Sequence, residues 1–373
     1  MAEHLFEVFY LIVWGLQRNR KAGSENPPDW CKILIIDMTA LTKLLASESS
    51  QGGPRPIDLR RDLNRVANLM ELCFADTLDA DGYRYLQQMR SAAKNPGYLR
   101  WANLAAEGGS IPVSGYVWEE AGEIIGNLTL IPYYNLSKRF FLVANVAVHP
   151  DSRRKGIATS LTDKAIEHAR QRGAQAVWLQ VRDDNEGAIR LYRTTGFVER
   201  ARRSTWLWEP SDSAEPVTPA IVGGVPQPAG IGVGKRHPAD WRLQRHWLPR
   251  LYPGELTWHL SLKLSALRPD LWGFLYRFLN DFQVRQWSAR RDNQLVGVLA
   301  WQSMPSYADS LWLAASPEHE AAAAHALLAH VRSRLRWHRP LALDYPAGRA
   351  SQAIQDAGFH LHQTLIWMSL ALV

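Results

Sequence analysis

The stretch from Phe140 to Phe197 limits the possible folds of this chain more than any other. Its first piece, FFLVANVAVHP, is an apolar run closed by Pro150, which predicts a buried strand that ends at a loop. Apolar residues then recur at helical spacing until Gly173 supplies a C-terminal stop. Ala176–Val181 predicts a second buried strand, and a short helix that ends at Gly196 follows it.

A basic turn joins the first of these strands to the first helix. It contains Arg153, Arg154, Lys155 and Gly156. Glycine lets the backbone approach a ligand, and the first N–H groups of a helix lack internal partners and carry part of the helix dipole. Three cationic side chains add full positive charges. The turn therefore predicts an anion site, for which a pyrophosphate is the natural ligand.

Two motifs in this stretch resemble those of the GNAT superfamily, the acyl-CoA-dependent N-acyltransferases. The first is Arg153-x-x-Gly156-x-Ala158, after a strand that ends Ala147-Val148-His149-Pro150. The second is Asn185-x-x-Ala188-x-x-Leu191-Tyr192-x-x-x-Gly196-Phe197, and a strand separates the two. The resemblance implies an α/β (α+β) fold with a mixed, mostly antiparallel central sheet flanked by helices. It also implies acetyl-CoA as the co-substrate, and no metal.

The resemblance assigns a role to each matching position. Backbone groups of Val146, Ala147 and Val148 would bond the pantetheine arm, and Asn185 would bond the cofactor. Tyr192 would lie near the CoA sulfur and protonate the leaving thiolate, a role that suits a phenol at neutral pH. The remaining cofactor-binding positions form the turn and the start of the helix, where peptide N–H groups would hold the pyrophosphate: Arg153, Arg154, Lys155, Gly156, Ile157, Ala158 and Thr159.

One position departs from the family pattern. Many members carry a carboxylate on the first strand, where this chain has Ala144, and the neighbouring Asn145 cannot take up a proton. An alkyl amine has an unperturbed pKa of about 10.4, so some group must favour its neutral form before it can attack. A water chain, a residue outside the stretch or an intrinsically acidic amine would meet this need. The general base stays unassigned.

Length and composition place the chain among ordinary globular proteins with two domains. It has 373 residues, of which 46% are hydrophobic and 21% charged, and a net charge of +7. The positive balance suits an anionic ligand such as CoA, but no basic tract is longer than Arg153–Lys155, so nucleic acid is not an expected partner. Cys31 and Cys73 cannot make a disulfide framework, and no Cys/His group has zinc-ligand spacing. A reducing cytoplasm is the expected location.

Residues 1–54 read as an N-terminal extension and linker. Leu5–Leu16 is apolar but too short to span a bilayer, so it is expected to pack on the body or to be an unnecessary extension, with an interfacial anchor as the alternative. Translation beginning at Met38 is a further possibility. Ser47–Pro54 has the composition of a flexible linker.

The first domain is expected at residues 55–209. Pro56–Arg60 suggests a first strand, helices are expected over 63–74 and 81–93, and a hairpin follows from Ser114 to Tyr134. The family resemblance places the two helices at the acceptor pocket. Asp76, Asp79 and Asp81 lie between them, either as capping and solvated loop residues or as an attraction for a cationic amine.

The remainder is predicted to be a Pro/Gly-rich linker at 210–235 and a degenerate GNAT-like domain at 236–373. The expected elements repeat the order of the first domain, including a helix over Glu318–Trp337 and a closing strand over Thr364–Leu372. The chemistry is absent, because Glu318 and Glu320 replace the basic turn and Ile354 replaces Tyr192. Histidines from His259 to His362 show no HExxH-type spacing, so no metal site is expected there.

The sequence therefore predicts an N-acetyltransferase that moves an acetyl or other short acyl group from acetyl-CoA to a primary amine. The amine, on a small molecule or a peptide, would attack the thioester directly in a ternary complex. A non-catalytic acyl-CoA sensor or regulatory protein is the alternative, favoured by Ala144 and disfavoured by Tyr192. Paired GNAT-fold proteins that acylate a sugar-linked thiol precursor, or that take aminoacyl groups from tRNA, fit less well. The oligomeric state is left open.

Overall fold

The computed structural model describes residues 52–94, 114–135, 138–210, 230–257, 260, 262–281, 283–335 and 339–372. The expectations for Leu5–Leu16 and for most of the 210–235 linker concern residues outside these ranges. Within them, Pro54–Trp118 and Ile124–Val373 belong to one unit, and Gly53 with Glu119–Glu123 belongs to another. We call residues 52–210 the first half and residues 230–372 the second half.

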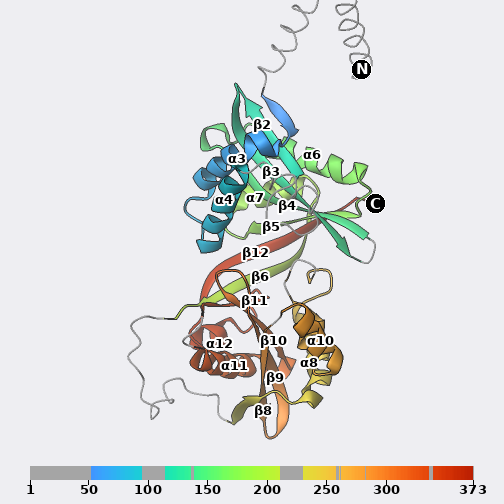
Figure 1. Cartoon of the computed structure of the whole chain (residues 1–373), viewed down its shortest axis with the longest axis vertical. Helices are drawn as coiled ribbons and strands as arrows, with labels where there is room; N and C mark the ends of the chain where they lie inside the picture. The colour runs from blue at the N-terminus through green and yellow to red at the C-terminus, as the bar shows by residue number, and fades with distance from the viewer. Residues whose placement is uncertain are drawn as a thin grey trace, which may run out of the picture. The chain divides into compact units, whose positions relative to one another are not determined.

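The first half contains the expected elements in the expected order (Figure 1). The strand placed at Pro56–Arg60 lies earlier, because the Asp58 side chain accepts the Arg60 N–H and starts a helix there. The elements are β1 (Gly53–Pro56), α3 (Leu59–Phe74), α4 (Ala80–Ala93), β2 (Ser114–Glu120), β3 (Glu123–Asn135), β4 (Lys138–Val148), α6 (Ile157–Gln171), β5 (Ala176–Arg182), α7 (Glu186–Thr194) and β6 (Val198–Trp208).

The second half repeats this order. Its first strand, β7, falls at the end of the stretch expected to be linker, where it pairs with β8 despite two glycines. The helix expected over Glu318–Trp337 is α11, and the last strand begins at His360 rather than at Thr364. The elements are β7 (Ile231–Lys235), α8 (Trp241–Leu251), α9 (Leu264–Leu267), α10 (Leu271–Leu279), β8 (Val284–Arg291), β9 (Gln294–Gln302), β10 (Asp309–Ala315), α11 (Glu320–Arg334), β11 (Leu341–Pro346), α12 (Ser351–Asp356) and β12 (His360–Ala371).

The described strands form one sheet in the order β1-β2-β3-β4-β5-β12-β6-β11-β10-β9-β8-β7. This order is symmetric. Each strand of the first half has a counterpart in the second half, from β1 and β7 to β6 and β12, and counterparts lie at equal distances from the two ends of the sheet. The last strand of each half has crossed over: β12 lies between β5 and β6, and β6 lies between β12 and β11. The two halves are therefore joined by a reciprocal exchange of strands, visible where β12 and β6 run side by side in Figure 1.

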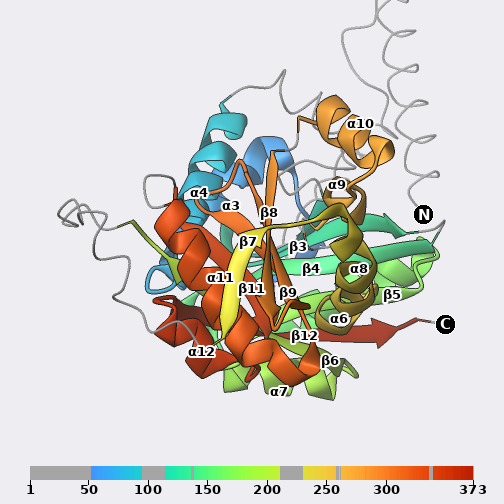
Figure 2. The ribbon, with the colours of Figure 1, turned by 90° about the horizontal axis from the view of Figure 1, so that it is seen from below.

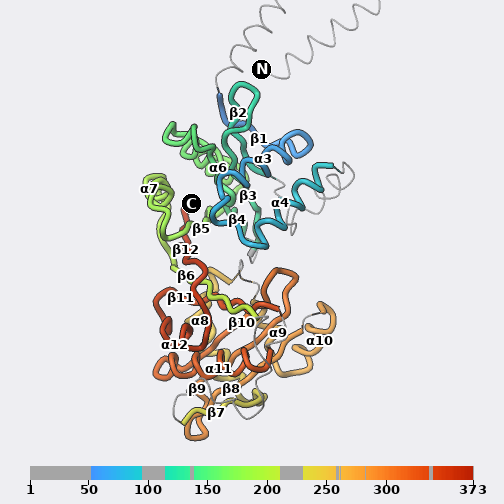
Figure 3. The backbone as a smooth tube through the Cα atoms, turned by 90° about the vertical axis from the view of Figure 1, so that its left-hand side faces the viewer, coloured from blue at the N-terminus to red at the C-terminus, as the bar shows by residue number. Residues whose placement is uncertain are grey.

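Helices cover both faces of this sheet. In the first half, α3 and α4 lie on one face and α6 and α7 on the other (Figure 3). In the second half, α11 and α12 lie on one side of the strands and α8 to α10 on the other (Figure 2). The apolar cluster beneath α6 and α7 includes Ile366 and Met368 of β12, so the second half supplies part of the first half's core.

An ion pair lies at the centre of the exchange. Arg203 of β6 is opposite Leu365 of β12. This pair is the midpoint of the β6–β12 ladder, with the same number of pairs on each side. Its side chain is 2% exposed, forms an ion pair with Asp344 of β11, and donates a 2.7 Å hydrogen bond to the Leu251 carbonyl. The guanidinium also lies over the Tyr252 ring, 5.1 Å from its centroid.

In the described part of the chain, no helix is long and apolar enough to cross a membrane.

Candidate active site

Strands β4 and β5 part before β4 ends. Their parallel register pairs Phe140–Val143 with Ala176–Leu179 and stops there, while β4 continues to Val148. On the other side, the register between β3 and β4 shifts by one residue, and Asn145 adopts a positive φ of 52°. This is a β-bulge, an irregularity that re-aims backbone groups and is common beside active sites. The segment predicted to bond the pantetheine arm, Val146–Val148, lies in the part of β4 that β5 does not pair.

The bulge is held in place by side chains on both sides. Asn145 donates from its side-chain amide to the Tyr85 hydroxyl of α4 at 3.1 Å, and its carbonyl accepts a 2.8 Å bond from the buried Asn127 side chain. Burial raises the pKa of Tyr85 to about 12, so this residue stays protonated at neutral pH and is not the missing base. Sequence reasoning missed Tyr85, because an aromatic residue on a helix reads as ordinary packing.

The basic turn has the geometry of an anion site. Arg154 and Gly156 have φ values of 66° and 79°, a conformation that turns successive N–H groups toward one side of the backbone. Helix α6 begins at Ile157 without a side-chain cap or an acidic residue in its first turn. A Cβ added at Gly156 would meet nothing within 4 Å, so its positive φ, rather than crowding, favours glycine there. Arg154, Lys155 and Gly156 are all exposed.

Asn185 and Tyr192 both lie in the motif around α7. The Asn185 side chain caps the helix by accepting the Ala188 N–H at 3.1 Å, which explains its place in the motif without a ligand. Tyr192 is 6% exposed and packs edge-on against Phe197. Burial raises its pKa, so the phenol keeps its proton at neutral pH, as a proton donor must.

The corresponding place in the second half is filled by the chain itself. The pairing of β10 with β11 also stops early, at Leu311 and Leu343. Beyond it, the Tyr252 hydroxyl accepts the Leu313 N–H at 3.2 Å. At the start of α11, the Glu320 carboxylate accepts bonds from Tyr345 at 2.8 Å and from Arg349 at 3.0 Å.

Ile354, the counterpart of Tyr192, is fully buried. A carboxylate and a tyrosine thus occupy, in the second half, positions that correspond to the predicted pyrophosphate and pantetheine sites of the first half.

The three aspartates around the start of α4 differ in their contacts. Asp79 caps α4 by accepting the Gly82 N–H at 2.8 Å, and Asp76 is exposed. Asp81 accepts the Tyr307 backbone N–H, which comes from the second half, at 2.9 Å. Among the described residues, no group of His, Cys, Asp and Glu could hold a metal ion. His259 and His338 lie outside the described ranges.

The part of the chain that contains the candidate site is similar to known proteins. Residues 68–197 match the model of the Acetyltransferase (GNAT) family. An uncharacterized N-acetyltransferase of Methanocaldococcus jannaschii is 34% identical over 113 residues, which are 30% of this chain and 48% of the relative. The [ribosomal protein bS18]-alanine N-acetyltransferase of Escherichia coli K12 is 39% identical over 62 residues, 17% of this chain and 42% of the relative. The chain thus spans less than half the length of these curated relatives.

Among solved structures, a GCN5-related N-acetyltransferase from Sphaerobacter thermophilus matches 86% of this chain and 95% of its own, with a TM-score of 0.52 and 17% identity. At this identity the likeness shows the fold alone. It extends over both halves of the chain, whereas the family model covers a part of the first half only.

Proposed function

We propose that the first half, whose residues 68–197 match the Acetyltransferase (GNAT) family model, transfers an acetyl or other short acyl group from acetyl-CoA to a primary amine. The observation that carries the proposal is the combination of three features in the first half. These are the end of β4 that β5 does not pair, with its bulge at Asn145, the basic turn before α6, and the buried phenol of Tyr192 on α7.

The described residues fit acetyl-CoA as a substrate. The turn at Arg153–Gly156 offers N–H groups, cationic side chains and an uncapped helix N-terminus to a pyrophosphate. Ile157, Ala158 and Thr159 extend this set into the first turn of α6. Val146, Ala147 and Val148 lie beyond the part of β4 that pairs with β5, and backbone groups on that side of the strand are suited to the amide groups of pantetheine. Asn185 would contribute its side-chain amide while capping α7.

In the proposed reaction, the amine nitrogen attacks the thioester carbonyl in a ternary complex. A C–N bond forms, the C–S bond breaks, and the sulfur leaves with the bonding electron pair and takes up a proton that Tyr192 donates. The amine loses one proton to water or to a group not yet assigned, because Ala144 offers no carboxylate, and Tyr192 regains a proton from solvent. N–H groups of the bulged strand would stabilise the negative charge that develops on the acyl oxygen. The products are an amide and CoA with a free thiol.

Gly156→Asp tests the proposal. The aspartate introduces a negative charge at the anion site and a Cβ at a positive φ, so acyl transfer from acetyl-CoA, measured as thiol release, should fall to background. Gly173→Asp is a matched control, because Gly173 ends the same helix with a φ of 66° and a Cβ added there would also meet nothing within 4 Å. Transfer at the parent rate by Gly156→Asp would show that the cofactor assignment is wrong.

The alternative, a protein that senses acyl-CoA without turnover, is favoured by Ala144 alone. The two proposals differ in turnover, not in binding. Acetyl-CoA at about 100 times its dissociation constant should stabilise either protein by about 2.7 kcal/mol. Thiol release across a panel of small-molecule and peptide amines would establish the enzyme, and stabilisation with no release for any amine would favour the sensor.

A further inference from the structure

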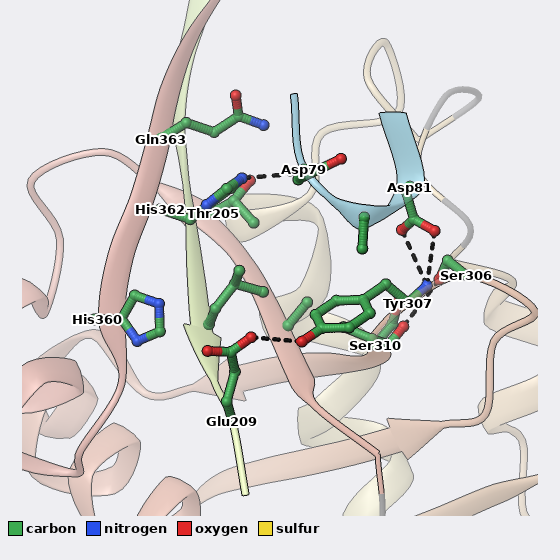
Figure 4. A pocket seen from close by; sticks show the side chains of 14 residues that line it. Asp79, Asp81, Thr205, Glu209, Ser306, Tyr307, Ser310, His360, His362 and Gln363 are labelled. Carbon is green, nitrogen blue, oxygen red and sulfur yellow. Dashed lines mark hydrogen bonds and ion pairs between the residues drawn. The ribbon is translucent and has the colours of Figure 1, made fainter. Parts of the chain in front are cut away.

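A pocket of about 380 Å³ lies where the two halves meet (Figure 4). It is lined by the start of α4, the exchanged strands β6 and β12, the loop before β10, and the first residues of β10 and β11. Its lining includes the carboxylates of Asp79, Asp81 and Glu209 and the imidazoles of His360 and His362. No lysine or arginine is among the described residues that line it. The pocket is therefore one of negative charge in a chain whose net charge is +7.

Small residues create the hollow. Its floor is formed by four residues that are opposite one another on neighbouring strands: Ser310 of β10, Ala342 of β11, Leu207 of β6 and His360 of β12. The symmetry of the sheet assigns each a counterpart, and the counterparts of Ser310 and Ala342 are Leu142 and Trp178, which are also paired with each other. Leu142 and Trp178 are each 6% exposed and fill the equivalent place in the other half. Among the described residues, the pocket is therefore found at this position and not at its counterpart, because Ser310 and Ala342 are smaller than Leu142 and Trp178.

The second half supplies a wall of this pocket through Tyr307. Its backbone N–H bonds both carboxylate oxygens of Asp81, at 2.9 and 3.0 Å, and its hydroxyl donates to Glu209 at 2.6 Å. Opposite, His362 of β12 lies 3.5 Å from the Asp79 carboxylate. Each ionised carboxylate has about four acceptor sites, so these contacts leave capacity for a ligand. Arg84 lies 3.3 Å from Asp81 and offsets part of its charge, which leaves Asp79 and Glu209 as the stronger cation sites.

The pocket lies on the same edge of the sheet as the candidate active site. β4 and β5 run parallel, and β5 and β6 are each antiparallel to β12, so β4, β5 and β6 end at the same edge. Helix α4 connects the two places. Asp81 at the pocket and Tyr85 at the bulge are four residues apart, which places their Cβ atoms about 5–6 Å apart on one face of the helix.

We propose that this pocket binds the acceptor and that the acceptor is an amine with a second positive charge, of the diamine or polyamine class. The inference rests on the acyl transfer proposed above. One ammonium group lies against Asp79 and Glu209, and the other amine reaches past α4 to the bulge at Asn145. The second half, which has lost its own site, contributes Tyr307, His360 and His362 to the selection of the acceptor.

Calorimetric titration of the full chain tests binding without turnover. The probes are 1,4-diaminobutane and n-butylamine, which differ by one amino group. The diamine should bind at least about tenfold more tightly than the monoamine, and the difference should shrink as NaCl is raised, because salt screens partly exposed charges. Equal affinity of the two amines would overturn the inference.

Three variants locate the binding. Glu209→Gln and Asp79→Asn remove one charge each, and asparagine keeps the helix cap that Asp79 supplies; each should weaken diamine binding several-fold. Ala342→Trp copies Trp178 and should abolish it. Glu255→Gln, at an exposed carboxylate outside the pocket, is the matched control and should bind as the parent does. Unchanged diamine affinity in both charge variants contradicts the proposal even if Ala342→Trp fails to fold.

Thiol release separates this inference from the proposed function. If the diamine is acylated with a higher kcat/KM than the monoamine and Glu209→Gln removes the preference, both stand. If the two amines are acylated equally, acyl transfer stands and the assignment of the pocket fails. If the diamine binds but no amine releases thiol, the proposed function fails, and with it the identification of the bound amine as an acceptor.

Discussion

Met368→Ala is the change that best tests the reciprocal exchange of strands. Met368 belongs to the second half in sequence, yet it is fully buried in the core beneath α6 and α7, together with Tyr192 and Leu179. Truncation of a buried methionine to alanine lowers the free energy of unfolding by about 2–5 kcal/mol. At about 2–4 °C per kcal/mol, the melting temperature should fall by roughly 4–20 °C. Leu361→Ala on the same strand is the control, because Leu361 is 49% exposed and its loss should change the stability by about 0.5 kcal/mol or less.

Hydrogen exchange measured by mass spectrometry shows where the loss of stability is felt. If β12 is a working strand of the first half, peptides that cover Ala176–Arg182 should exchange faster in Met368→Ala, because their partners on β12 include Met368 itself, opposite Leu179. Faster exchange confined to residues 230–372 would refute the reasoning. A parent-like melting temperature in residues 52–210 expressed alone would refute it as well.

Three further predictions follow from single side chains. Tyr192→Phe should lower kcat by about 10²–10⁴-fold with little change in acetyl-CoA affinity, because it removes the proton donor alone; a parent kcat in steady-state thiol release would show that another group protonates the sulfur. Arg203→Met should lower the free energy of unfolding in urea by about 3–5 kcal/mol, because it leaves Asp344 without its partner, and the double variant with Asp344→Leu should recover part of that loss. Burial raises the pKa of Tyr85 to about 12 in the folded protein, against about 10 in the unfolded chain. Its neutral form therefore contributes stability below pH 10, and this contribution is lost as the pH rises from 10 through 12. Tyr85→Phe should reduce the loss of stability over that pH range, measured by denaturant titration at each pH.

Local patterns are sufficient to predict most elements, including the strand, turn and helix that carry the candidate site. The strand, turn and helix around Gly156 follow from apolar spacing and turn chemistry, and they are where the sequence places them. The acidic residues at the start of α11 are expected to spoil the second site, and one of them, Glu320, accepts bonds from Tyr345 and Arg349 there.

Long-range pairing is not predictable in the same way. The stretch of β12 is predicted to be a closing strand, but nothing within β12 or β6 indicates which half it will join, because that choice depends on partners more than a hundred residues away. A local reading assigns β7 to the linker because its two glycines outweigh Ile231 and Val233. Tyr85 and Tyr307 escape prediction for a related reason. Each gains its importance from a contact with a distant part of the chain.

The symmetric strand order of the sheet also limits which mutations such a protein can tolerate. When two domains of one chain fold separately, an early stop codon can remove the second domain and leave the first intact. Here a stop after residue 209 would take β12 away from β5 and β6, and the surviving half would lose Ile366 and Met368 from its own core. The second half can therefore differ from the first at single positions, as it does at Ile354 and Glu320, and still supply β12, whereas deletion of that half would open the core of the first.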